Sequence, residues 1–188
     1  MLKITSQEVD PKAAALTTET FEMITQHWQT ILPEITVVIT RKPFNQIPEL
    51  REVCDIQNKQ PGWRKSYWRV TQVICPEIEI EERRAVLWVR YDYQSSWMPP
   101  DYYFQKRLFE VIAKIIWCMS PEFRQEILGQ VTGMACDSEA AAYLAFRDSF
   151  SRFFLNPEYL KERKQTAWSF MKRLDHMLLL KSKSSPVD

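Results

Sequence analysis

Glycine and histidine are both scarce in this chain of 188 residues, which has three glycines and two histidines. None of the glycines stands in a G-x-G-x-x-G or G-x-x-x-x-G-K pattern, which excludes a glycine-rich phosphate-binding loop of either kind. A catalytic zinc normally needs two or three histidines, completed by Asp or Glu, and only His27 and His176 are present. The sequence therefore predicts neither a metal nor another cofactor.

Long apolar runs, a strong net charge and paired cysteines are missing as well. No apolar run is long enough to span a membrane, and a formal net charge of +1 gives no field that would attract nucleic acid or a membrane surface. Cys54, Cys75, Cys118 and Cys136 form no C-x-x-C pair, and no pattern joins any of them to a histidine. Scattered cysteines of this kind are typical of free thiols in a reducing compartment, so we expect a cytoplasmic protein.

The remaining composition is that of a globular chain, with 45% hydrophobic and 26% charged residues. Strands are predicted in the first half and helices mainly in the second. The expected strands are 35–40, 67–74, and 78–80 with 84–91, which form either one broken strand or a hairpin arm. The expected helices are 18–32, 49–56, 103–117, 121–128, 139–155 and 158–180. This order predicts an α+β fold, with a small mixed or antiparallel sheet packed against a helical C-terminal half. We expect one domain over 18–180, a flexible N-terminus at 1–17 and a disordered tail at 181–188.

The helix expected at 103–117 is apolar around most of its circumference. Phe104, Leu108 and Ile112 recur at helical spacing, and only a narrow charged stripe interrupts the apolar surface. A helix of this kind cannot lie on the surface, so we expect it near the centre of the domain.

Residues 145–160, AFRDSFSRFFLNPEYL, resemble the last conserved block of zincin-type metalloproteases of the anthrax lethal factor kind. Residues 166–174 resemble the end of that block, and the helix and strand expected at 18–32 and 35–40 resemble the beginning of the same fold. The resemblance implies a zincin-like fold in which 103–117 is the central helix.

In active members of that family the central helix carries His-Glu-x-x-His, in which the two histidines bind zinc and the Glu is the general base. The best placement of this motif matches the Glu to Glu110 and puts Phe109 and Ala113 where the histidines would stand. The third ligand, a Glu in active members, falls on Asp148. The resemblance thus implies a degenerate domain, a pseudoprotease without its metal site. Because toxins of the anthrax group carry a second, motif-less copy that binds protein, it also implies a protein-binding adaptor, inhibitor or regulatory module.

Two carboxylates of the lost site leave another interpretation open. Glu110 and Asp148 are candidates for an unusual carboxylate or metal site in an active enzyme. The simpler interpretation is that each forms an ion pair four residues away, Glu110 with Lys106 or Lys114 and Asp148 with Arg152.

Aromatic residues mark two candidate binding surfaces. The segment before the central helix is rich in residues that are frequent at interface hot spots: Tyr91, Tyr93, Trp97, Met98 and Tyr102. This segment is our candidate surface for a protein partner, unless its rings cover the core. A second stretch mixes basic and aromatic residues in a manner suited to nucleic acid: Trp63, Arg64, Lys65, Trp68 and Arg69. An edge strand with charged residues is the simpler interpretation of that stretch.

Overall fold

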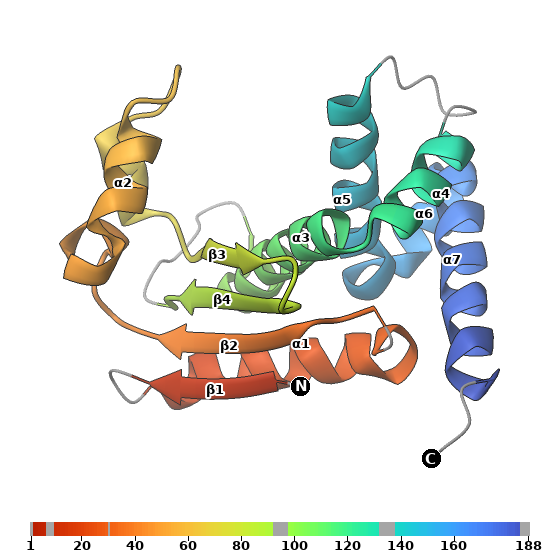
Figure 1. Ribbon diagram of the computed structural model, residues 1–188, viewed down its shortest axis with the longest axis horizontal. Helices are drawn as coiled ribbons and strands as arrows, with labels where there is room; N and C mark the ends of the chain where they lie inside the picture. Colours follow the sequence, from red (N-terminus) through yellow and green to blue (C-terminus); the bar gives the residue numbers. More distant parts are fainter. Residues whose placement is uncertain (1, 7–9, 30, 92–97, 132–137, 185–188) are drawn as a thin grey trace.

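The structure is a computed structural model that describes residues 2–6, 10–29, 31–91, 98–131 and 138–184 (Figure 1). Its strands are β1 (Leu2–Ser6), β2 (Glu34–Ile39), β3 (Val73–Glu79) and β4 (Arg84–Val89). Its α-helices are α1 (Pro11–Trp28), α2 (Arg51–Asn58), α3 (Pro100–Met119), α4 (Pro121–Val131), α5 (Glu139–Leu155), α6 (Pro157–Arg163) and α7 (Gln165–Ser184). Three short 3-10 helices, η1 (Phe44–Gln46), η2 (Pro48–Leu50) and η3 (Lys65–Arg69), flank α2.

The four strands form one mixed sheet in the order β1-β2-β4-β3. β1, β2 and β4 run parallel, whereas β3 pairs antiparallel with β4 and lies at the edge of the sheet. The backbone of Arg83, with a φ of 51°, belongs to the turn between β3 and β4, where its N–H donates to the carbonyl of Ile80 at 3.2 Å. Pro76, which has no N–H to donate, is tolerated in β3 because edge strands leave one side unpaired.

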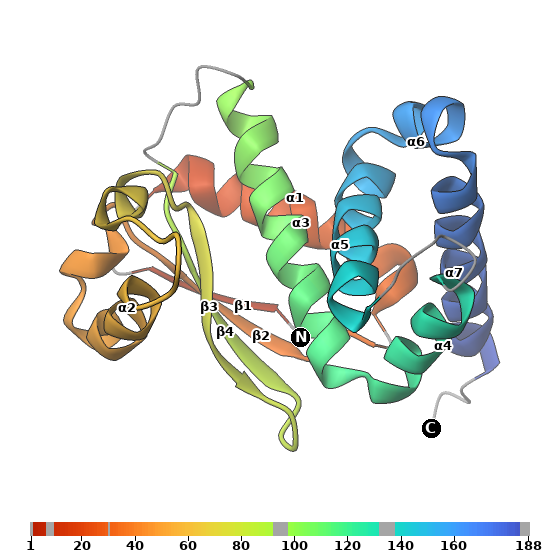
Figure 2. The same ribbon diagram turned by 90° about the horizontal axis from the view of Figure 1, so that it is seen from above.

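Helices α1 and α3 cover one face of the sheet. Alternate residues of β2, namely Ile35, Val37 and Ile39, are almost fully buried on this face, as the two-residue period of a strand requires. Phe104, Leu108, Ile112 and Ile115 of α3 have no exposed surface. Both views show α3 between the sheet and α5, with α7 beyond (Figures 1 and 2). The sequence-based expectation of a central, buried helix is confirmed.

A lobe formed by residues 41–71 covers part of the opposite face of the sheet. Phe44, Leu50 and Trp68 of this lobe pack in a second apolar cluster with Trp88 of β4. The buried Arg90 attaches the lobe to the end of β4, because its Nε donates to the carbonyl of Arg41 at 3.2 Å and its Nη1 donates to the carbonyls of Trp68 and Arg69 at 3.3 and 3.4 Å.

Several expected elements are wrong. Residues 1–17 were expected to be flexible, yet they contain β1 and the first two turns of α1, which Asp10 caps by accepting from the N–H of Ala13 at 3.0 Å. No strand spans 67–74, because η3 folds Trp68 into the lobe and β3 begins at Val73. The two segments pair or pack with residues far away in the chain, so local periodicity could not reveal them.

Other helix boundaries also differ from the expected ones. Helix α3 runs from Pro100 to Met119, where 103–117 was expected. Helix α4 continues past Gly129 to Val131, and the expected helix 158–180 is divided into α6 and α7 at Lys164. Helix α7 reaches Ser184, so it enters the expected tail, of which 185–188 lie outside the described residues. Within the described ranges, no helix combines the length and the apolar character that crossing a membrane requires.

Candidate functional site: a cleft between the lobe and the helices

A cleft of about 590 Å³ lies between the lobe and the helices. The lobe forms one wall, the start of β3 forms the floor, and α3 and α5 form the other wall. The lining residues are Val53, Gln57, Trp63, Tyr67, Trp68, Val70 and Thr71 from the lobe, Val73, Ile74 and Cys75 from β3, and Tyr103, Arg107, Val111, Lys114 and Arg147 from the helices.

The cleft face of α3 consists of Tyr103, Arg107, Val111 and Lys114. Spacings of three and four residues place these side chains on one side of the helix. Two pairs on this face, Tyr103 with Arg107 and Arg107 with Val111, have the i and i+4 spacing that two zinc-binding histidines would need. The helix contains no histidine, so no placement of the motif on α3 supplies an imidazole.

Phe109 and Ala113, the proposed positions of the lost ligands, lie on a different face of α3. Both are fully buried. The ring of Phe109 stacks on Phe154 with 5.0 Å between centroids and meets the edge of Phe150 at 6.1 Å. These two positions therefore contribute to the apolar core against α5 and do not line the cleft.

Glu110 is buried beside the cleft and is fully occupied by two cations. Lys106 donates its Nζ to Oε1 at 2.6 Å, and Arg107 Nη1 contacts Oε2. The sequence predicted the pair with Lys106 as one of two alternatives. Lys114, the other one, forms no ion pair within the described parts of the chain.

Asp148 on α5 is also held by two cations. Arg152 Nε donates to Oδ1 at 2.9 Å, as the i+4 spacing predicted, and Lys164 Nζ donates to Oδ2 at 3.1 Å. Partial burial opposes ionisation, yet these two hydrogen bonds outweigh it and lower the pKa of Asp148 below its ordinary value. Across the described ranges, neither a hydrogen bond nor an ion pair joins Glu110 to Asp148.

Neither histidine is among the residues that line the cleft. His176 is exposed on α7, and His27 lies on α1 with a side chain outside the described set. In those parts of the chain that the structure describes, no group of three or more His, Cys, Asp or Glu side chains is arranged to hold a metal ion.

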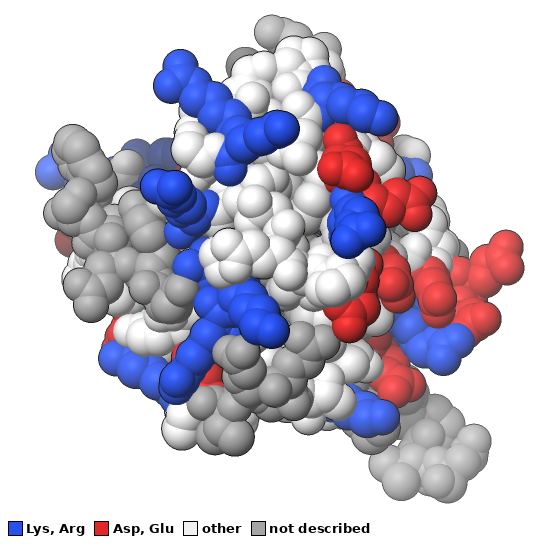
Figure 3. Space-filling model, turned by 90° about the vertical axis from the view of Figure 1, so that its left-hand side faces the viewer, with Lys and Arg blue, Asp and Glu red and all other residues white. Residues whose placement is uncertain are grey.

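The basic and aromatic stretch 63–69 is divided between the core and the surface. Trp68 is buried and donates its Nε1 to Oδ1 of Asn58 at 2.9 Å. Trp63 lines the cleft and meets the rings of Tyr67 and Trp68 edge to face at 5.4 and 5.0 Å. Arg64, Lys65 and Arg69 are exposed on the lobe. Figure 3 shows this side of the molecule, where lysine and arginine predominate on the left and acidic residues lie mainly on the right, with some basic residues among them.

The proposed partner-binding residues are only partly described. Tyr93 and Trp97 lie outside the described residues. Met98 is 38% exposed, whereas Tyr102 is half-buried. The hydroxyl of Tyr91 contacts Asp101, and Lys12 lies 2.8 Å from Asp101 and 5.1 Å above the centre of the Tyr91 ring. Tyr91 therefore joins the first turns of α1 and α3 instead of offering a free contact surface.

The same cluster perturbs all three of its titratable groups. Hydrogen bonds to Asp101 and Tyr91 raise the pKa of Lys12 to about 12, and the bond from Lys12 lowers the pKa of Asp101. Burial and the bond to Asp101 raise the pKa of Tyr91.

Sequence reasoning missed the helical wall of the cleft. Arg147 on α5 lies 5.9 Å from the centre of the Tyr143 ring, and the Nε of Arg147 is buried without a hydrogen-bond acceptor. Burial raises the pKa of Tyr143.

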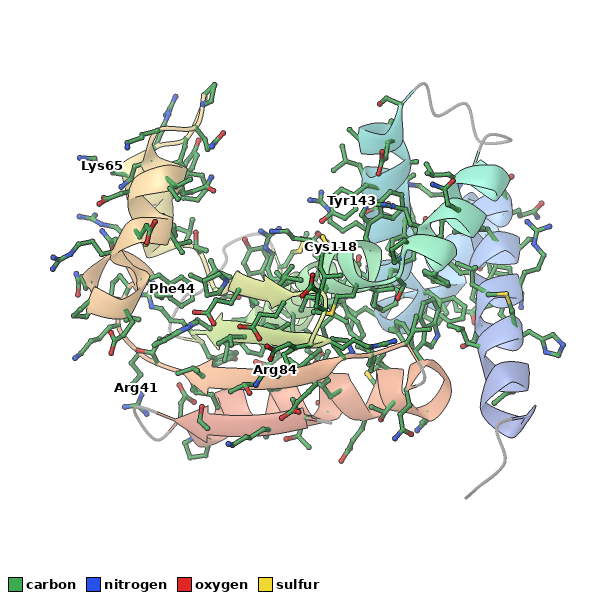
Figure 4. All side chains as sticks on the ribbon, viewed as in Figure 1. Arg41, Phe44, Lys65, Arg84, Cys118 and Tyr143 are labelled. Carbon is green, nitrogen blue, oxygen red and sulfur yellow. The ribbon has the colours of Figure 1, made fainter. Side chains whose placement is uncertain are left out.

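On the floor of the cleft, burial raises the pKa of the Cys75 thiol to about 12. Figure 4 shows Tyr143 projecting from α5 toward the cleft and Cys118 below it. The spacing of Arg107, Val111 and Lys114 was visible in the sequence, but nothing local indicated that this face is open.

Comparison with known proteins shows the fold. No protein-family model matches the chain, and no curated protein matches it. Among solved structures the chain is similar to the Pro-Pro endopeptidase PPEP-2 from Paenibacillus alvei, with a TM-score of 0.52 and 14% sequence identity over 92% of this chain and 96% of that one. The zincin-like α+β fold class predicted from the sequence is confirmed. At this identity the likeness extends to the fold and not to the activity.

Proposed function

We propose that this chain is a zincin-like domain that binds an extended segment of another protein in its cleft and does not hydrolyse that segment by zinc chemistry. One observation carries the proposal. The helix that forms the cleft wall has no histidine, and its i, i+4 pairs on the cleft side are Tyr103 with Arg107 and Arg107 with Val111. Both pairs include Arg107, whose guanidinium has donors only, so neither pair can supply two ligands to a metal ion.

The arrangement of carboxylates supports the same conclusion. All four oxygens of Glu110 and Asp148 are engaged by lysine or arginine, so a metal ion bound there would first have to displace two cations from each carboxylate. An acid–base pair would also need both groups within reach of one substrate atom, and these carboxylates lie in separate ion-pair clusters. An unusual enzyme built on these residues is therefore the less favoured function.

The floor of the cleft supports a polypeptide as the ligand. β3 is the outer strand of the sheet, and Val73, Ile74 and Cys75 line the cleft. In the described part of the chain, no strand pairs with the outer edge of β3. An extended peptide can add to such an edge through backbone hydrogen bonds. The irregular register after Ile74, together with Pro76, limits this pairing to the first residues of β3.

Panning a displayed random peptide library against the full-length protein tests the proposal, together with metal analysis of the purified protein. We expect zinc well below one equivalent and enriched peptides that mass spectrometry recovers intact. The variant Val111→Trp places a bulky, uncharged side chain on the cleft wall and should weaken the enriched peptides by about tenfold or more. The matched control is Ile56→Trp in the lobe, because Ile56 is 54% exposed and is not among the residues that line the cleft.

Two results would contradict the proposal. One is stoichiometric zinc accompanied by cleavage of the selected peptides. The other is an absence of enriched peptides, or a set that binds Val111→Trp as well as the unchanged protein. Circular dichroism and the melting temperature of both variants establish that they are folded.

A further inference from the structure

We propose that the segment bound in the cleft is acidic and that Lys114 and Arg147 recognise its carboxylates; this rests on the proposed function, which makes the cleft a peptide site. The described lining contains three cations, Arg107, Lys114 and Arg147, and no Asp or Glu. The lobe on the opposite side adds to this imbalance, since residues 41–71 include seven basic and three acidic residues. A concave surface lined by one sign of charge concentrates ligands of the other sign.

The three cations are not equally available. Arg107 is already held by Glu110. Lys114 is exposed and, among the described residues, has neither an ion pair nor a hydrogen bond. Arg147 lies over the ring of Tyr143 and has no carboxylate partner in the described ranges. The two cations left for a ligand therefore come from neighbouring helices, α3 and α5, and face one cleft.

Two buried donors give an independent indication of what the ligand must supply. Trp63 Nε1 on the lobe wall and Arg147 Nε on the helical wall are both buried without an acceptor. Both residues line the cleft. Leaving a buried donor unsatisfied costs free energy, so these two side chains gain when they shift toward a ligand that offers an acceptor. Ionised carboxylates are negatively charged and only accept hydrogen bonds. An acidic peptide can therefore pair with the cations Lys114 and Arg147 and accept from the donors of Trp63 and Arg147.

The same observations favour a peptide over a single-stranded nucleic acid. Stacking of bases requires free aromatic faces, and Trp63 has its ring packed edge to face with Tyr67 and Trp68. Trp68 itself is 2% exposed. The edge strand on the floor offers backbone partners that match a polypeptide and not a sugar–phosphate chain.

The test uses fluorescence anisotropy with the full-length protein and three labelled probes. The first is a short synthetic peptide that alternates glutamate with valine, the second replaces each glutamate with glutamine, and the third is a short oligothymidylate. We expect the glutamate peptide to bind at least about tenfold more tightly than the glutamine peptide. The difference should narrow between ~50 and ~200 mM salt, because mobile ions screen exposed charges.

Charge-matched double variants locate the binding. Lys114→Gln with Arg147→Gln should weaken the glutamate peptide about tenfold or more and leave the glutamine peptide unchanged. Lys161→Gln with Arg173→Gln removes the same charge from exposed positions on α6 and α7 and should change the affinity less than about twofold.

Each other result overturns the inference in a recognisable way. If the two peptides bind with equal affinity and both lose affinity in Val111→Trp, the cleft binds peptides without regard to their charge, and the proposed function stands. If both double variants lose affinity for the glutamate peptide equally, the charge of the whole surface attracts the peptide and the cleft does not. If oligothymidylate binds more tightly than the glutamate peptide, the cleft is a nucleic-acid site. If the protein dimerises and Lys114→Gln with Arg147→Gln abolishes the dimer, the cleft binds a second copy of the chain. If neither peptide binds, the inference of an acidic ligand is refuted. If the displayed library also yields no enriched peptides, the proposed function is refuted as well.

Discussion

Phe109, which the resemblance to zincins placed at the position of a lost ligand, packs in the core. Its ring has no exposed surface and contacts Phe150 and Phe154 on α5. We predict that Phe109→Ala lowers the free energy of unfolding by about 3–5 kcal/mol, because the cavity cannot collapse fully. Urea unfolding measures the change, and Phe109→Leu should cost much less because it retains most of the volume. An effect below about 1 kcal/mol for the alanine variant would show that this ring does not stabilise the core.

Asp148 gives a pH-dependent prediction at the same scale. Its folded-state pKa lies below the ordinary value of 3.8, so its ion pairs stabilise the fold above that pH and are lost as the pH falls through the lower folded-state pKa. We predict that Asp148→Asn lowers the free energy of unfolding at neutral pH by at most about 1 kcal/mol, because the side chain is partly exposed and screened by water. The difference from the unchanged protein should shrink below about pH 4.

The matched control for that prediction is Asp55→Asn, which alters an exposed carboxylate of α2 that has no ion pair among the described residues. Its effect on unfolding should be small at every pH. If the cost of Asp148→Asn persisted or grew in acid, the ion pairs with Arg152 and Lys164 would not be its cause.

At the scale of elements, one side chain connects the lobe to the sheet. Arg90 is 7% exposed and donates to three carbonyl groups of the lobe. We predict that Arg90→Met costs about 2–3 kcal/mol, because charge-assisted hydrogen bonds are lost and buried acceptors remain. Hydrogen exchange should accelerate more in 41–71 than in α3, since the lobe has its own apolar cluster. Arg69→Met, an exposed position in the same lobe, serves as control, and uniform acceleration throughout the molecule would contradict this role of Arg90.

Helix α3 and the stretch 67–74 show which elements the sequence could reveal. In α3 every local signal agrees, because the apolar spacing, the length and the preceding prolines all favour a long buried helix. In 67–74 the aromatic and β-branched residues favour a strand by propensity. The segment instead forms η3, because Trp68 enters the second cluster and Arg90 occupies the carbonyls of Trp68 and Arg69. Long-range contacts of this kind leave no periodic pattern in the sequence.

At the scale of the whole molecule, the lobe and the helical half are two walls of one cleft, and the sheet supplies the floor between them. The near-neutral net charge hides an uneven distribution, because the basic lobe is offset by acidic residues elsewhere in the chain. A zincin-like fold is retained at 14% identity to the Paenibacillus endopeptidase. Apolar patterning tolerates such divergence, whereas a zinc site depends on a few individual ligands.

The sequence by itself determined the α+β class, the buried central helix and the lack of histidines on that helix. Each of these is a local property, set by periodicity or by the presence of a residue type. Only the tertiary structure decided that β1 pairs with β2, that Phe109 and Ala113 face the core, and that Arg107, Lys114 and Arg147 line one cleft opposite Trp63. These arrangements depend on contacts between segments far apart in the chain, and the direction in which an amphipathic face points is settled by what packs against it.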